Sequence, residues 1–141
     1  MTEILFENKL VAVLNKGIDP GKVMNALGHM SIGLGAVIGK ENLRLTAYRD
    51  ADGGLHPSIS EMPFMILSEK NSNKIRKLRQ EALEKKILFT DFTDTMTVGT
   101  WQEQVEKTAT VADENLVYFG IVLYGKWELV TELTRKCSLW R

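Results

Sequence analysis

An apolar strand that leads into an uncharged helix limits the folds open to this chain. Residues 10–14 read Leu-Val-Ala-Val-Leu, which has the length and composition of a buried strand. Asp19 then stands at an N-cap position, and Pro20 fits the first helical position, where its missing N–H costs nothing. Residues 23–39 contain no Asp, Glu, Lys or Arg. We therefore expect a strand, a turn and a helix that packs closely on a sheet.

The start of this helix predicts an anion-binding site. The first backbone N–H groups of a helix have no partner within the helix, and they point outward from its N-terminus. Lys22 adds a full positive charge beside them. Open α/β sheets bind ligands at the carboxyl ends of their strands, which is where this helix begins. The start of this helix is therefore the first candidate site of the chain.

The remaining elements predict a single α/β domain over residues 1–141. Buried strands are expected at residues 63–67, 87–92 and 116–124, and helices at residues 71–86, from Thr100 onward, and at residues 126–135. Because strands and helices alternate, we expect a largely parallel sheet with helices on both faces. Residues 43–59 read as a small hairpin excursion from the core.

Charge and cysteine content exclude several classes of protein. The chain has 18 basic and 18 acidic side chains among its 141 residues, so no global field attracts nucleic acid. Cys137 is the single cysteine, which excludes a disulfide framework and a cysteine-based zinc site within one chain. The N-terminus lacks the basic and apolar regions of a signal peptide, and no segment is long enough to span a membrane. We expect a cytoplasmic protein without metal or cofactor.

Two motifs resemble the type 2 peptidyl-tRNA hydrolase fold. The first is Gly21-Lys22, followed by His29 seven residues after the lysine. The second is Asp91 at the end of a strand, with Thr95 four residues later. In detail the chain resembles a bacterial branch of that fold, domain of unknown function family 2000. The turn of residues 48–53 and the long segment before the last strand are typical of that branch.

The resemblance implies a three-layer α/β/α fold whose mixed four-stranded sheet has its last strand antiparallel. It also implies catalytic roles for three residues that face a common cleft. Asp91 would orient or deprotonate a water, Lys22 would stabilise a developing oxyanion, and Thr95 would position the substrate. The alternative for Lys22 and Asp91 is a salt bridge that fixes the helix start to the sheet. Direct or single-water contact between them is expected in either case.

The same resemblance implies ligand-binding roles for residues near these three. The candidate residues are Gly21, Asn25, His29 and Thr93. His29 also has a simpler interpretation as a hydrogen-bonded histidine of the core, because no second metal ligand follows at helical spacing.

Two departures from the hydrolases change the expected substrate. Ala26 stands where the hydrolases have a glutamine, and Asp94 stands where they have a basic residue. We therefore expect a substrate smaller than tRNA, and metal-independent hydrolysis of a small acyl ester or a related bond. The alternative is a non-catalytic module that binds an anion, a nucleotide or another protein. The small residues of the first helix are also consistent with a homodimer.

Overall fold

A computed structural model describes residues 6–141 of the chain. The expectation for the N-terminal sequence concerns mainly residues 1–5, which lie outside the described residues. The main elements are, in chain order, β1 (Asn8–Asn15), α1 (Pro20–Ile38), β2 (Leu45–Arg49), β3 (Leu55–Ser60), β4 (Phe64–Glu69), α2 (Ser72–Glu84), β5 (Leu88–Thr93), α3 (Trp101–Ala109), β6 (Tyr118–Lys126), α4 (Trp127–Leu133) and β7 (Ser138–Leu139). Two short 3₁₀ helices, η1 (Asp94–Met96) and η2 (Asp113–Asn115), flank α3.

The central sheet is mixed and has five strands in the order β5-β6-β1-β4-β7. β1 and β4 are parallel, whereas β6 is antiparallel to both of its neighbours, β1 and β5. The expected antiparallel orientation of the strand at residues 116–124 is therefore confirmed. The expected number of four strands is wrong, because β7 adds a fifth strand on the outer edge of β4. Two residues are too few to show an alternating pattern, so no sequence pattern predicts β7.

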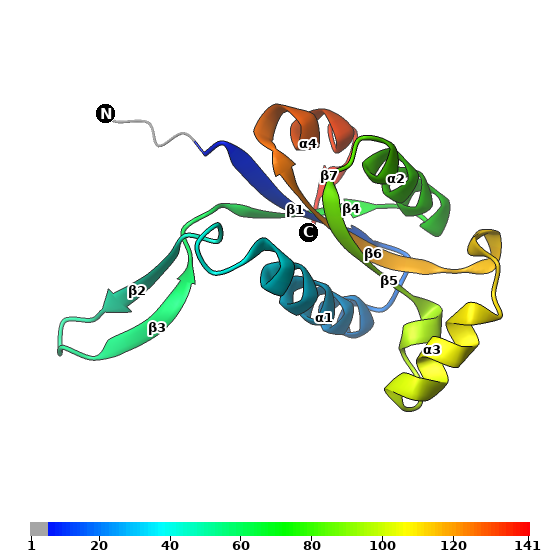
Figure 1. The fold of residues 1–141 in the computed structure, drawn as a ribbon, viewed down its shortest axis with the longest axis horizontal. Coiled ribbons are helices and arrows are strands. Elements are labelled where there is room, and N and C mark those ends of the chain that lie inside the picture. The colour runs from blue at the N-terminus through cyan, green and yellow to red at the C-terminus, as the bar shows by residue number, and fades with distance from the viewer. Residues whose placement is uncertain (1–5) are drawn as a thin grey trace.

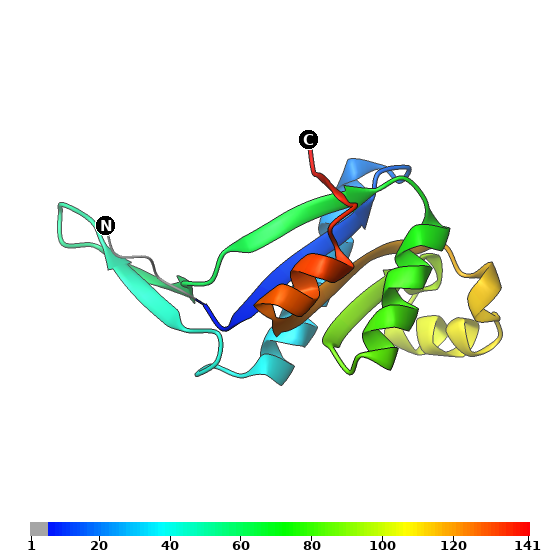
Figure 2. The ribbon, with the colours of Figure 1, turned by 90° about the horizontal axis from the view of Figure 1, so that it is seen from above.

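Helices pack on both faces of this sheet (Figures 1 and 2). Leu10, Ala12 and Leu14 of β1 share a core with the inner face of α1. Val11 and Val13 share the other core with α2 and α4. Successive side chains of a strand point to opposite faces, so the continuous apolar run of β1 serves both cores.

The start of α1 forms as its sequence predicts. Asp19 is the N-cap, and its carboxylate accepts a hydrogen bond from the N–H of Gly21 at 2.8 Å. Pro20 occupies the first helical position. The inner face of α1 repeats at three- and four-residue steps and is buried through Val23, Ala26, Met30, Leu34 and Ile38. The expected close packing of α1 on the sheet is therefore confirmed for this inner face.

The excursion at residues 43–59 is a two-stranded hairpin that projects from the body of the protein (Figures 1 and 2). Residues 45–60, here called the arm, are all exposed except the partly buried Thr46 and Ser60. The arm is fixed at its base, where the Ser60 hydroxyl donates to the carbonyl oxygen of Leu43 at 2.6 Å. In residues 6–141, no helix is both long and apolar enough to cross the bilayer.

Candidate functional site

A cleft of about 380 Å³ opens between α1, β5 and the start of the η1–α3 segment. We call it the α1–β5 cleft. It lies along β5, an outer strand of the sheet, and reaches the carboxyl end of that strand. Its lining consists of Asn25, His29, Met30, Thr90, Asp91, Phe92, Met96, Thr97 and Gln104. Three of the sequence-derived candidates, Asn25, His29 and Asp91, are therefore brought to one place.

Lys22 and Asp91 form no direct ion pair in the described residues. Oδ2 of Asp91 accepts a hydrogen bond from Nε of Arg79 at 3.1 Å. Arg79 belongs to α2, which packs on the sheet face opposite to α1. Lys22 is exposed in the first turn of α1 and makes no ion pair with any residue of the described chain. The carboxylate at the edge of the cleft is thus directed to the other side of the sheet.

The surroundings of Asp91 act on its acidity in opposite directions. Burial of the carboxyl is the largest cause and raises its pKa above the ordinary value of 3.8. The Arg79 guanidinium lowers this pKa through its charge and its hydrogen bond, and the charge of Asp113 raises it. The net shift is upward, so the guanidinium compensates only part of the burial of Asp91.

Thr93 and Thr95 are buried members of a hydrogen-bonded chain of hydroxyl groups. Oγ1 of Thr93 lies 2.8 Å from Oγ1 of Thr95, which lies 2.7 Å from Oγ1 of Thr108. Thr108 donates its single hydroxyl proton to the carbonyl oxygen of Gln104. Thr95 must therefore donate to Thr108, and Thr93 to Thr95. This one-way chain connects the end of β5 and η1 to α3, and it occupies the Thr95 hydroxyl proton.

His29 is exposed, so its interpretation as a core histidine is wrong. Its ring stacks on Phe92, with ring centroids 6.0 Å apart and an interplanar angle of 29°. Lys22, Asn25 and His29 are separated by three and four residues, so they lie along one stripe of α1. The Gly21 N–H is already bonded to the Asp19 cap, so part of the expected anion-binding capacity of the helix start is used internally.

Sequence reasoning did not identify the far wall of the cleft. Met96, Thr97 and Gln104 follow the end of β5 and enter α3. The signal that was available is the capping box of Thr100 and Glu103, which starts α3 as expected. A capping box fixes where a helix starts, but it carries no information on which side of the sheet the helix lies.

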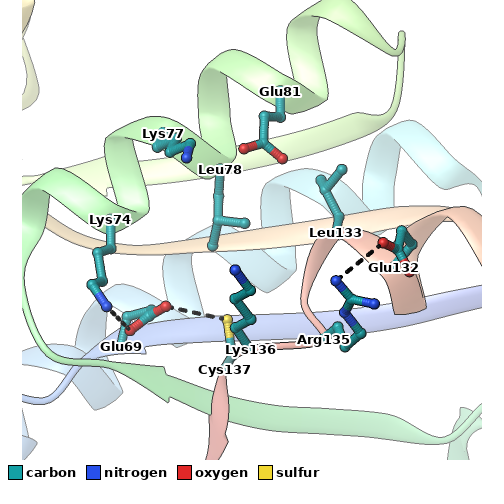
Figure 3. A pocket seen from close by; sticks show the side chains of 10 residues that line it. All are labelled: Glu69, Lys74, Lys77, Leu78, Glu81, Glu132, Leu133, Arg135, Lys136 and Cys137. Carbon is teal, nitrogen blue, oxygen red and sulfur yellow. Dashed lines mark hydrogen bonds and ion pairs between the residues drawn. The ribbon is translucent and has the colours of Figure 1, made fainter.

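A second hollow of about 360 Å³ lies between α2, α4 and the C-terminal segment (Figure 3). Basic and acidic side chains both line it, and Glu69 faces Lys74 at 4.0 Å and the Cys137 thiol at 3.7 Å. Burial, followed by the charge of Glu69, raises the pKa of Cys137 to about 12. This hollow therefore offers neither an activated thiol nor a single dominant charge. Across the described residues, no group of three or more His, Cys, Asp or Glu side chains is placed to hold a metal ion.

Fold and site together define an α/β protein with a mixed sheet and an open, mainly uncharged cleft beside its first helix. The family model for a protein of unknown function, DUF2000, matches residues 8–141. The chain belongs to this family.

The structural comparison supports the same fold. A protein of unknown function from Agrobacterium tumefaciens strain C58 superposes with a TM-score of 0.84 at 18% sequence identity. The match covers 97% of this chain and 100% of that one. None of the curated proteins compared with the chain matches it.

Proposed function

We propose that this DUF2000 protein binds a small anionic ligand with an amide group and an apolar part in the α1–β5 cleft. Asn25 and Gln104 supply side-chain amides, each of which both donates and accepts hydrogen bonds. Met30, Phe92 and Met96 supply an apolar surface. Lys22 stands one turn before Asn25 on the same stripe of α1 and offers a positive charge for a carboxylate. An N-acyl amino acid has all three complementary parts.

The observation that carries this proposal is the direction of the Asp91 carboxylate. Its hydrogen bond to Arg79 turns it away from α1, so the cleft has binding groups but no free carboxylate to act as a base. General-base catalysis needs a carboxylate within about 3 Å of the atom that carries the proton, or joined to that atom by one water. The geometry therefore favours recognition of a ligand over its hydrolysis.

We also infer that the fold is related to the type 2 peptidyl-tRNA hydrolases, although the ligand differs. The relation is supported by the Lys22-to-His29 and Asp91-to-Thr95 spacings. Ala26 is fully buried and presents no group to a substrate. The Asp94 carboxylate accepts a hydrogen bond from the N–H of Val117 at 3.0 Å, and its negative charge repels phosphate. Both departures argue against tRNA as the partner.

Metal-independent hydrolysis of a small acyl ester is the second candidate function. It is favoured by an imidazole, His29, and a hydroxyl, Thr97, that line the same cleft. The Thr97 hydroxyl donates to the carbonyl oxygen of Asp94 at 2.8 Å, so it must give up this bond before it acts as a nucleophile. Because of this requirement, hydrolysis is less favoured than ligand binding as the function of the cleft.

Calorimetric titration with two matched compounds tests the binding proposal. N-acetyl-L-phenylalanine carries a carboxylate, and its primary amide lacks that charge. We expect the acid to bind more tightly, and we expect Lys22→Ala to remove the difference between the two. Asn25→Ala should weaken both compounds, and Lys40→Ala, at the other end of α1, should change neither.

Two outcomes contradict the proposal: no heat of binding for either compound, or equal effects of Lys22→Ala and Lys40→Ala. Release of nitrophenol from nitrophenyl acetate, measured with and without His29→Ala, tests the second candidate. A histidine-dependent release would favour hydrolysis over binding alone.

A further inference from the structure

The exposed side of α1 carries no charged residue after Lys22, and three of its exposed side chains are large and apolar. Met24 is 64% exposed, Ile32 76% and Val37 65%. Between them lie exposed small or neutral residues, and no charged side chain occurs between Lys22 and Lys40. A solvent-facing helix surface normally carries charged residues, and their depletion is typical of the centre of a protein interface.

The arm also exposes large apolar side chains, beside the charged residues of its turn, and it lacks a surface to pack on. Its side chains Tyr48, Leu55 and Ile59 are 52%, 61% and 61% exposed. A hairpin of two strands is marginally stable alone in water and needs a helix or further strands against it. Residues 6–141 of the same chain supply no such cover, because the arm extends away from the body (Figures 1 and 2).

A third apolar surface lies on α3. Trp101 and Val105 are 71% and 63% exposed and line a shallow hollow of about 510 Å³. Met96 and Gln104 line both this hollow and the α1–β5 cleft. The apolar surface of α3 therefore continues through the cleft to α1. Of the sixteen large apolar side chains exposed in the described residues, ten belong to α1, the arm or the segment from Val98 to Val105, so exposed apolar surface is concentrated there.

We propose that these three surfaces form one interface with a second copy of this chain. The arm and α3 lie at opposite ends of the molecule, with α1 between them (Figures 1 and 2). A two-fold axis through the middle of α1 would place the two α1 helices antiparallel. The same rotation would bring each arm onto α3 of the other copy. Such self-complementarity is what a closed dimer requires.

The size of the three surfaces agrees with a dimer. A helix rises 1.5 Å per residue, so α1 is about 28 Å long and α3 about 14 Å, each roughly 10 Å wide. With the arm they present on the order of 600 Å² of projected area per copy. Accessible area exceeds projected area on a surface of side chains. A standard interface buries about 800 Å² of accessible surface per partner, so these surfaces are large enough.

The dimer would bring the partner's arm to the rim of the α1–β5 cleft, because Met96 and Gln104 belong to both surfaces. The inference itself does not depend on which ligand the cleft binds. It rests on the lack of a packing surface for the arm, on the uncharged exposed side of α1, and on the positions of both relative to α3.

Sedimentation of the full chain tests the inference. The protein concentration is set to about 100 μM, which is above the micromolar Kd of a weak interface of this size. We expect twice the mass of the 15.9 kDa chain. Ile32→Glu, Ile59→Glu and Val105→Glu each place a charge in one of the three surfaces and should give monomers. Leu83→Glu on α2, where leucine is 53% exposed, is the matched control and should remain dimeric. A monomeric wild-type chain, or equal effects of all four variants, overturns the inference.

Cross-linking tests the contact between the arm and α3 even if a charged variant fails to fold. In a Cys137→Ser background, a chain with Ile59→Cys and Val105→Cys should form a covalent dimer with a short bifunctional maleimide. A chain with Ile59→Cys and Leu83→Cys should not form one. Cross-linking of the second pair but not of the first shows that the arm lies elsewhere and overturns the proposed arrangement.

Discussion

Nε of Arg79 donates a hydrogen bond to Oδ2 of Asp91 at 3.1 Å, across the sheet face opposite to α1. The exposed fractions of the two side chains are 32% and 18%, so the pair is only partly screened by water. The ion pair therefore determines the direction of the Asp91 carboxylate, whereas burial is the largest cause of its raised pKa.

Loss of Arg79 should destabilise the fold. We expect Arg79→Ala to lower the free energy of unfolding by about 1–2 kcal/mol at pH 7, between the values for exposed and buried pairs. Chemical denaturation measures this difference. Arg135→Ala breaks the exposed pair with Glu132 and is the matched control, with an expected change below about 0.5 kcal/mol. Equal effects of the two substitutions would show that the Arg79–Asp91 pair has no special role.

The raised pKa of Asp91 predicts a pH dependence of stability with a defined sign. Between the ordinary value of 3.8 and the raised value, the folded chain binds more protons at Asp91 than the unfolded chain does. The contribution of Asp91 to stability must therefore fall as pH rises through this window. The measured quantity is the unfolding free energy of the wild type minus that of Asp91→Asn, followed from pH 3 to pH 7. A difference that increases with pH contradicts the assignment.

The Thr95 hydroxyl is predicted to stabilise the fold and not to contact the ligand. Thr95→Val removes the middle of the hydroxyl chain and leaves Thr93 without its acceptor, at an expected loss of about 1–2 kcal/mol in unfolding free energy. Affinity for N-acetyl-L-phenylalanine should be unchanged in the folded variant. Lost affinity with unchanged stability would restore the substrate-positioning role that the motif suggested.

Cys137 should be unreactive near neutral pH. With its pKa raised to about 12 from 9.0, its thiolate fraction at pH 8 is roughly a thousandfold smaller than that of an ordinary cysteine. Iodoacetamide alkylation, followed by mass spectrometry, should be correspondingly slow. Glu69→Gln should accelerate the alkylation, because the charge of Glu69 is the second cause of the shift. Alkylation as fast as that of free cysteine would contradict this environment.

The parts of the fold that depend on local signals were predictable from the sequence. Asp19 and Pro20 fixed the start of α1, and Thr100 and Glu103 fixed the start of α3, because a cap acts within one helical turn. The apolar run of β1 identified a central strand. β7 was not predicted, because its two residues form a strand only by pairing with β4, which is distant in sequence.

The site was only partly predictable, because its geometry depends on which face of β5 each side chain takes. Phe89, Thr90, Asp91 and Phe92 show no clean alternation of polar and apolar side chains. The motif spacing therefore placed Asp91 correctly at the end of a strand without giving its direction. Arg79, its partner, lies twelve residues earlier on another element and belongs to no motif.

Release of the peptide from peptidyl-tRNA by the purified protein distinguishes a cleft that binds a small ligand from one in which Lys22 and Asp91 form a hydrolytic pair. We predict no release above the uncatalysed rate, and the same result for Lys22→Ala and Asp91→Asn. Rapid release by the wild-type chain that either substitution abolishes would contradict the account.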